Sequence, residues 1–249
     1  MNKQTFADKM KSYKKHPGSF IWMMLVMFSA VITFTILIFI IVYILVNGIP
    51  YIKPSLFALE YTSENASLTP AFINTITMTL LSLLIAVPLG IFAAIFLVEY
   101  AGRGNKFVEV IRLTTETLSG IPSIVYGLFG MLFFVTTCGW GFSILAGAFT
   151  LSIMILPLII RTTEEALKSV PDSYREGSFG LGAGKLRTVF RIVLPSSIPG
   201  ILAGIILAIG RIVGESAALL YTAGSSDLLP VSVKGYLDKI FQSGGTLTI

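Results

Sequence analysis

Five long apolar runs, separated by short polar stretches, constrain this chain more than any other feature. They cover residues 20–46, 72–98, 113–135, 142–160 and 198–221. A helix needs about 20 apolar residues to cross a bilayer, and lipid offers a backbone group no hydrogen-bond partner outside the helix itself. The runs therefore predict an all-α, polytopic transmembrane bundle with five spans.

Composition supports a membrane protein rather than a water-soluble domain. Hydrophobic residues make up 54% of the 249 residues and charged residues only 12%, whereas soluble domains are about a quarter charged. The first run is long, uninterrupted and followed by no small-residue cleavage site, so it predicts a retained helix rather than a signal peptide.

Several function classes are disfavoured by what the sequence contains. Cys138 is the only cysteine and His16 the only histidine, which excludes an intrachain disulfide and leaves no soft-metal cluster. No G-x-x-x-x-G-K-[ST] phosphate loop occurs, so any ATP would be bound by another chain. The net charge of +5 is explained by its distribution and does not indicate nucleic-acid binding.

Lysine and arginine are concentrated on alternate sides of the predicted spans. Residues 1–17 hold five, 99–112 three and 161–196 six, whereas the other side holds only Lys53, Lys234 and Lys239. Positive residues favour the cytoplasmic side, so we expect the N-terminus and the 161–196 loop in the cytoplasm and the C-terminal tail outside. The predicted parts are a basic N-terminus (1–17), a first helix with an external loop (18–70), a helical core (71–222) and an external tail (223–249).

The polar segment 161–196 is predicted to form two short helices joined at a glycine turn. Val170-Pro171 ends an extension of the fourth span, because proline disfavours helix at the residue before it. Asp172 or Ser173 can cap the next helix, with Glu176 in its first turn. Glycines then permit a reversal before a second piece, 185–194. An ordinary amphipathic segment at the membrane surface is the alternative interpretation.

The fifth apolar run contains two charges. Arg211 and Glu215 are four residues apart, so on a continuous helix they share a face and can pair. A charge at the bilayer centre costs at least about 2.5 kcal/mol on insertion scales, so it is uncommon without a task. Either the pair is structural, or Arg211 presents its guanidinium to a crossing oxyanion, with Ser216 as an added donor.

The third run is interrupted by Ser119-Gly120-Ile121-Pro122-Ser123. Glycine and proline free backbone groups that neighbours or a cavity must satisfy. A kink that serves packing is the preferred interpretation, and a place where the Ser123 hydroxyl meets an anion is the alternative.

Several segments resemble the PstA-type permeases of phosphate ABC importers, over residues 71–235. The segments are EGSFGLGAGKLRTVFRIVLP (176–195), RIVGESAALLYTAG (211–224), RTTEEALKSVP (161–171), LSGIPSIVYGLF (118–129) and AVPLGIFAAIFLVEY (86–100). Segment 176–195 resembles the EAA loop, which binds the ATPase subunit in this family. Its anchors are Glu176, Gly182 and Pro195, with Gly177 and Ser178 where the family has a double alanine.

The resemblance implies a function and a set of partners. It implies a prokaryotic plasma-membrane importer with a second, PstC-type permease, an ATP-binding subunit dimer that holds ATP and Mg²⁺, and an external phosphate-binding protein. It also implies that Arg211 and Glu215 matter for transport and that the loop around Glu176 and Gly182 contacts the ATPase. This chain itself is expected to need no cofactor, to catalyse no reaction and to contact membrane lipid.

The sequence leaves alternatives to a phosphate permease. Arginine chemistry does not separate phosphate from sulfate or molybdate, so a permease for another oxyanion remains open. A non-conducting signalling or scaffold subunit could use the same loop to bind a soluble partner. The family ordinarily has a sixth span, which is expected to be missing here, since the sequence ends at Ile249.

Overall fold

The computed structural model describes residues 17–58, 67–101, 106–224 and 238–248. Helices account for the regular structure of these residues, and no strand occurs among them. The elements are α2 (Pro17–Gly48), η1 (Ile49–Tyr51), η2 (Pro54–Phe57), α3 (Thr69–Ile95), η3 (Phe96–Tyr100), α4 (Lys106–Ser119), α5 (Ser123–Gly130), η4 (Met131–Thr137), α6 (Ile144–Lys168), α7 (Asp172–Gly180), α8 (Lys185–Thr188), η5 (Val189–Val193), α9 (Leu194–Val213) and α10 (Ala217–Leu220).

The chain divides into two compact units, residues 1–54 and 55–249. In the first, α2 and η1 form a candidate span over Gly18–Tyr51. Its side chains are apolar around the whole helix, as expected of a helix surrounded by lipid. The basic stretch 1–16 lies outside the described residues.

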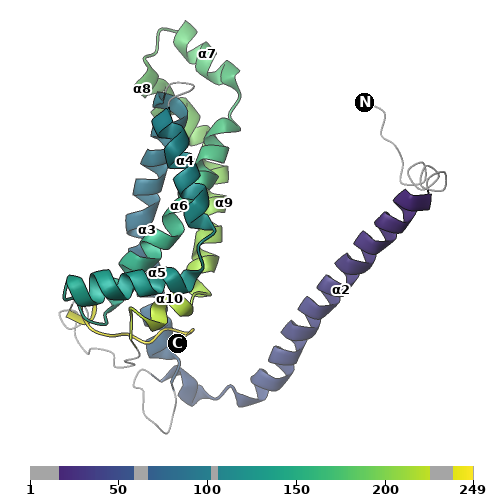
Figure 1. Ribbon diagram of the computed structural model, residues 1–249, viewed down its shortest axis with the longest axis vertical. Helices are drawn as coiled ribbons and strands as arrows, with labels where there is room; N and C mark the ends of the chain where they lie inside the picture. The colour runs from purple at the N-terminus through teal and green to yellow at the C-terminus, as the bar shows by residue number, and fades with distance from the viewer. Residues whose placement is uncertain (1–16, 59–66, 102–105, 225–237, 249) are drawn as a thin grey trace. The chain divides into compact units, whose positions relative to one another are not determined.

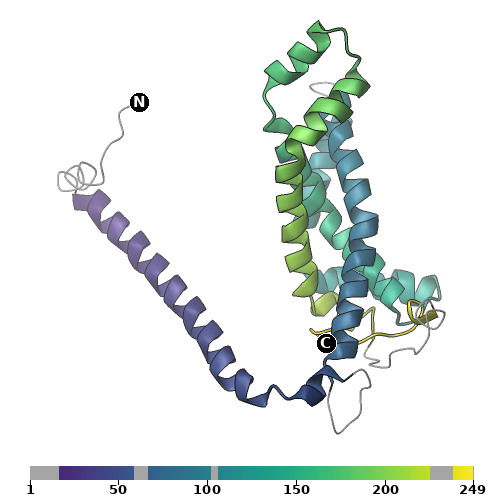
Figure 2. The same ribbon diagram turned by 180° about the vertical axis from the view of Figure 1, so that it is seen from behind.

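The second unit is built on the pair α3 and α6, which run side by side in Figures 1 and 2. Small residues of α3 recur every fourth position against α6: Ser82, Ala86, Gly90 and Ala94 are all buried. Small residues let two membrane helices approach closely, and hydroxyls then bond across the interface. Ser82 donates to the Ala148 carbonyl at 3.1 Å and Ser152 donates to the Ser82 carbonyl at 3.2 Å.

Helix α9 also packs on α6 by the same principle, and it contacts α3 as well. A Cβ added at Gly200 would lie 2.7 Å from the Ala166 Cβ, and one added at Gly204 would lie 2.7 Å from the Thr162 Cβ. The two glycines are one helical turn apart, so together they form a flat strip on α9. Helices α3, α6 and α9 thus form the core of the bundle.

The third predicted span is not one straight helix. The chain breaks at 120–122, and α4 with α5 and η4 forms a pair bent by 100°. Pro122 precedes α5 in an extended conformation, and the Tyr126 hydroxyl bonds the Leu118 carbonyl across the break at 2.9 Å. Figure 1 shows α5 lying across one end of the bundle, next to α10. The expectation of a kink within one span understated the bend.

Among the described residues, four helices are long and apolar enough to cross a membrane, or five if the bent pair counts as one span. The prediction of an all-α, multi-pass membrane bundle is therefore confirmed. The fifth predicted span is shifted, because its helix runs from Lys185 to Val213 and then stops. The second piece predicted for the polar segment is thus continuous with that span.

The C-terminal residues 238–248 return to the end of the bundle formed by α10 and the start of α3 (Figure 1). The Asn74 side chain donates to the Gly245 carbonyl at 2.9 Å, and the Leu247 amide donates to the Thr75 hydroxyl at 3.1 Å. Of the predicted external tail 223–249, residues 225–237, which include Lys234, lie outside the described residues.

Candidate functional site

The polar segment folds into a helix, a glycine turn and a second helix at one end of the bundle (Figure 2). Helix α7 ends where Gly182 takes a left-handed backbone angle, φ +80°, which glycine adopts without steric cost. The Gly182 amide bonds the Phe179 carbonyl at 2.9 Å and the Ala183 amide bonds the Ser178 carbonyl at 3.1 Å. These two bonds satisfy carbonyls that the helix end would otherwise leave unpaired.

The start of α7 differs from the prediction. Pro171 occupies the cap position and no side chain caps the helix. Asp172 lies in the first helical turn and its carboxylate accepts from Arg175 Nη1 at 3.2 Å. Neither Asp172 nor Ser173 is therefore the cap, because proline takes the cap position and starts the helix one residue earlier than expected.

The predicted docking residues do not all face outward. Glu176, Gly177, Gly182 and Pro195 are exposed, whereas Ser178 is buried. The Ser178 hydroxyl lies 2.8 Å from that of Thr188, so it joins α7 to α8. A small residue at position 178 is thus explained by packing within the loop. Gly177 has open space around it.

Beside the glycine turn lies an open hollow of about 310 Å³. Its lining residues are Ser178, Leu181, Gly182, Ala183, Arg187, Arg191 and Ile192. Leu181 is 91% exposed, and neither arginine has an ion-pair partner among the described residues. A surface with an exposed apolar tip and two arginines is suited to a partner that offers an apolar pocket and acidic groups.

The two charges of the fifth apolar run do not pair. Arg211 lies in the last turn of α9, and the helix ends at Val213. The Glu215 carboxylate instead accepts from the Ala218 amide at 3.2 Å, at the start of α10, and no ion pair joins it to Arg211. The expected sharing of a helix face is wrong because Gly214 follows the end of the helix.

Arg211 and Glu215 lie at the end of the bundle opposite α7, by α10 in Figure 1. Both are half-buried, as is Ser123, whereas Ser216 is exposed. Arg211 is within electrostatic range of Tyr126, one helical turn along α5 from Ser123. Of the four residues predicted for the substrate path, Ser123 begins α5, Arg211 lies in the last turn of α9, and Glu215 and Ser216 lie between α9 and α10. Helix α10 packs against α5.

Comparison with known proteins identifies the family. Residues 86–248 match the model of the binding-protein-dependent transport system inner membrane component. The chain belongs to this permease family. Its loop at 172–195 and its helical bundle are therefore those of a transport permease, and the resemblance to PstA-type permeases is confirmed.

Several curated relatives are similar to the permease. It is 40% identical over 184 residues to the probable ABC transporter permease protein YqgI of Bacillus subtilis, covering 73% of this chain and 62% of that protein. It is 40% identical over 163 residues to the phosphate transport system permease protein PstA 1 of Mycobacterium tuberculosis, covering 66% and 52%. It is 38% identical over 204 residues to PstA of Pasteurella multocida, covering 79% and 70%. The chain thus spans about half to two thirds of the length of these relatives.

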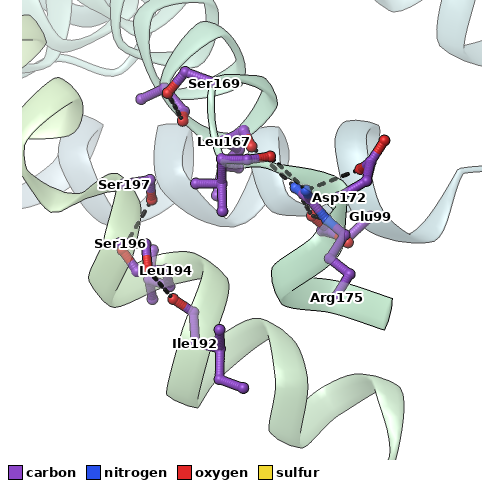
Figure 3. Close-up of polar contacts among 11 residues, drawn as sticks. Glu99, Leu167, Ser169, Asp172, Arg175, Ile192, Leu194, Ser196 and Ser197 are labelled. Atoms are coloured by element: carbon purple, nitrogen blue, oxygen red, sulfur yellow. Dashed lines mark hydrogen bonds and ion pairs between the residues drawn. The ribbon is translucent and has the colours of Figure 1, made fainter. Parts of the chain in front are cut away.

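A set of ion pairs at the α7 end of the permease was not predicted from the sequence. Arg175 bonds Glu99 through Nε at 3.1 Å and Nη2 at 2.8 Å. Glu164 accepts from Arg112 at 2.7 Å and from Lys168 at 2.6 Å. Only the pair of Glu164 and Lys168 had a local signal, an i, i+4 spacing on one helix. The others join residues far apart in the sequence, as Figure 3 shows for Arg175 and Glu99.

Proposed function

We propose that the chain is a membrane subunit of an ATP-driven importer that moves inorganic phosphate into the cell. The observation that carries the proposal is the family match over residues 86–248 together with the similarity to proteins named as phosphate permeases. The relative YqgI is named only as an ABC transporter permease, so the choice of phosphate rests on the PstA-named relatives.

The proposed assembly has this chain beside a second, PstC-type permease, above a dimer of ATP-binding subunits and below an external phosphate-binding protein. The exposed surface around Glu176, Leu181 and Gly182 would contact the ATPase on the cytoplasmic side of the membrane. The distribution of lysine and arginine predicts that the loop and the N-terminus lie on that side. ATP and Mg²⁺ would be bound by the ATPase dimer. Hydrolysis there would move α7, and α7 would move the bundle.

At the opposite end, Arg211 would meet phosphate on its path. A guanidinium presents a fork of donors that matches two oxygens of a tetrahedral oxyanion, and this one has no carboxylate partner among the described residues. Glu215 would act indirectly, because its carboxylate holds the start of α10. Ser216 and Ser123 would offer hydroxyls near the same place.

The test is ATP-dependent uptake of labelled phosphate into vesicles that hold the complete set of subunits. We expect Arg211→Ala to lose uptake at normal abundance. Glu215→Gln keeps an oxygen for the Ala218 amide but removes the charge, so it separates structural capping from an electrostatic role. Arg161→Ala is the control, because Arg161 is exposed and, within the described part of the chain, its one ion-pair partner is the exposed Glu165.

Two outcomes would overturn the proposal. Transport of sulfate or molybdate instead of phosphate by the wild-type assembly would change the substrate. Equal phosphate uptake in cells with and without this chain would favour a signalling or scaffold subunit that binds a soluble partner through the same loop.

A further inference from the structure

We propose that Arg175 links α7 directly to α3, so that a force on α7 moves α3 and α6 together. This inference rests on the proposed function, because it concerns how the loop passes movement to the bundle. The backbone already connects the loop to α6 and α9. The Arg175 contact would connect it to α3 as well.

All the nitrogen atoms of the Arg175 guanidinium are engaged (Figure 3). Nε and Nη2 donate to one oxygen of Glu99, in η3 at the end of α3. Nη2 also donates to the Leu167 carbonyl at 3.0 Å and Nη1 to the Val170 carbonyl at 2.8 Å. The fork shape of arginine lets one side chain reach a carboxylate and two carbonyls at once, which a lysine ammonium does not reproduce.

Leu167 lies in the last turn of α6 and Val170 lies two residues beyond the helix end, where backbone carbonyls lose the regular amide partners of the helix. Arg175 therefore caps α6 with a positive charge, the sign favoured at a helix C-terminus. The same guanidinium is tied to the end of α3. One side chain on α7 thus holds the ends of the two helices that form the largest interface of the bundle.

Burial makes this contact strong enough to transmit movement. The side chains of Arg175 and Glu99 are only 15% and 8% exposed, so water screens their attraction poorly. Removing Arg175 would leave the buried Glu99 carboxylate without an ion-pair partner among the described residues, which is far costlier than losing an exposed pair. The bond of Arg175 to Asp172 is the exposed contrast, since the Asp172 side chain is 80% exposed.

Without Arg175, α7 would have weaker attachment to the bundle at its start. Residues 169–171 join α6 to α7, and Pro171 is extended there, outside either helix. Movement of α7 could then be absorbed by rotation about this connection. With Arg175 in place, α7 and the ends of α3 and α6 form one body, and the small-residue interface of α3 and α6 carries the movement onward.

The experiment measures phosphate imported per ATP hydrolysed by the complete transporter in vesicles. The test variants are Glu99→Gln, which keeps an oxygen but removes the charge, and Arg175→Lys, which keeps the charge but removes the fork. Asp172→Asn is the matched control, because it likewise keeps an oxygen but removes the charge, at the exposed partner of the same arginine. Abundance and co-purification of the ATPase are measured for each variant.

We expect both test variants to assemble and to hydrolyse ATP while importing less phosphate for each ATP. A residue that modulates coupling between two sites typically changes it by a factor of roughly 2 to 30. Asp172→Asn should keep the wild-type ratio. A purely structural role would lower uptake, hydrolysis and abundance together and leave the ratio unchanged, and that result would overturn the inference.

An unchanged ratio at normal abundance in both test variants would also overturn it, as would an equal fall in Asp172→Asn. Failure of the proposed function is distinguished by the wild type. If the wild-type assembly imports no phosphate, the proposed function fails before any variant is compared. If it imports phosphate and the ratio does not respond to Glu99→Gln or Arg175→Lys, only the link through Arg175 fails.

Discussion

Replacing Gly90 with alanine tests whether the bundle depends on close approach of α3 and α6. A Cβ at this position would lie 2.6 Å from Ile159 Cγ2 and 3.1 Å from Ile159 Cβ, closer than the ordinary carbon–carbon separation of about 3.5–4.0 Å. Ile159 cannot swing its Cγ2 away, because a β-branched side chain has one strongly preferred χ1 rotamer in a helix. The two helices must therefore separate.

Two effects of opposite sign set the magnitude. Alanine is favoured over glycine in a helix by about 1 kcal/mol, whereas forcing an extra carbon into a packed interface typically costs about 1–3 kcal/mol. Gly210→Ala provides the first effect alone, because Gly210 is also helical and a Cβ there would meet no atom within 4 Å. The difference in stability between the two variants therefore isolates the packing cost, about 1–3 kcal/mol.

The assay is reversible unfolding of the purified transporter in mixed micelles, followed by circular dichroism at matched protein and lipid concentrations. Gly90→Ala should unfold more readily than Gly210→Ala. Combining Gly90→Ala with Ile159→Ala should cost less than the two single changes together, by at least about 0.5 kcal/mol, because the new methyl group occupies space that the isoleucine vacates. If Gly90→Ala and Gly210→Ala are equally stable, the contact between Gly90 and Ile159 does not limit how closely α3 and α6 pack.

The backbone angle of Gly182 and the hydroxyl of Ser152 provide two further tests. Gly182→Ala should weaken co-purification of the ATPase subunit, because a φ of +80° costs a side-chain-bearing residue about 1–2 kcal/mol. Gly177→Ala should leave co-purification unchanged, since Gly177 has a helical backbone and open space around it. Equal binding of the ATPase by both variants would contradict the prediction. Ser152→Ala removes a hydroxyl shared between the Ala148 carbonyl of its own helix at 2.6 Å and the Ser82 carbonyl of α3 at 3.2 Å. It should lower bundle stability by about 0.6 kcal/mol, with an upper bound of about 1.7 kcal/mol. Unfolding in micelles measures the loss, and a larger one would show that the serine also fills space that alanine cannot.

The helices and the loop were predictable because each depends on local sequence. An apolar run long enough to span a membrane has few alternatives to a helix there. The glycines at 180–184 predicted the change of chain direction that occurs at Gly182. The third run shows the limit of this reasoning. The proline at 122 signals a break, but the size of the bend depends on where α5 packs, and α5 packs against α10, about ninety positions later in the chain.

The charges show the same limit more sharply. Spacing predicted that Arg211 and Glu215 would share a helix face, which holds only if the helix continues past Gly214, and it does not. Spacing could not predict that Arg175 would meet Glu99, because the two are 76 positions apart and the bent α4–α5 pair and all of α6 lie between them. A local rule finds ion pairs within one helix, where they are mostly exposed and weak. The buried pair of Arg175 and Glu99 joins several helices and forms only when the bundle folds. Sequence patterns alone therefore do not predict it, although the proposed coupling depends on it.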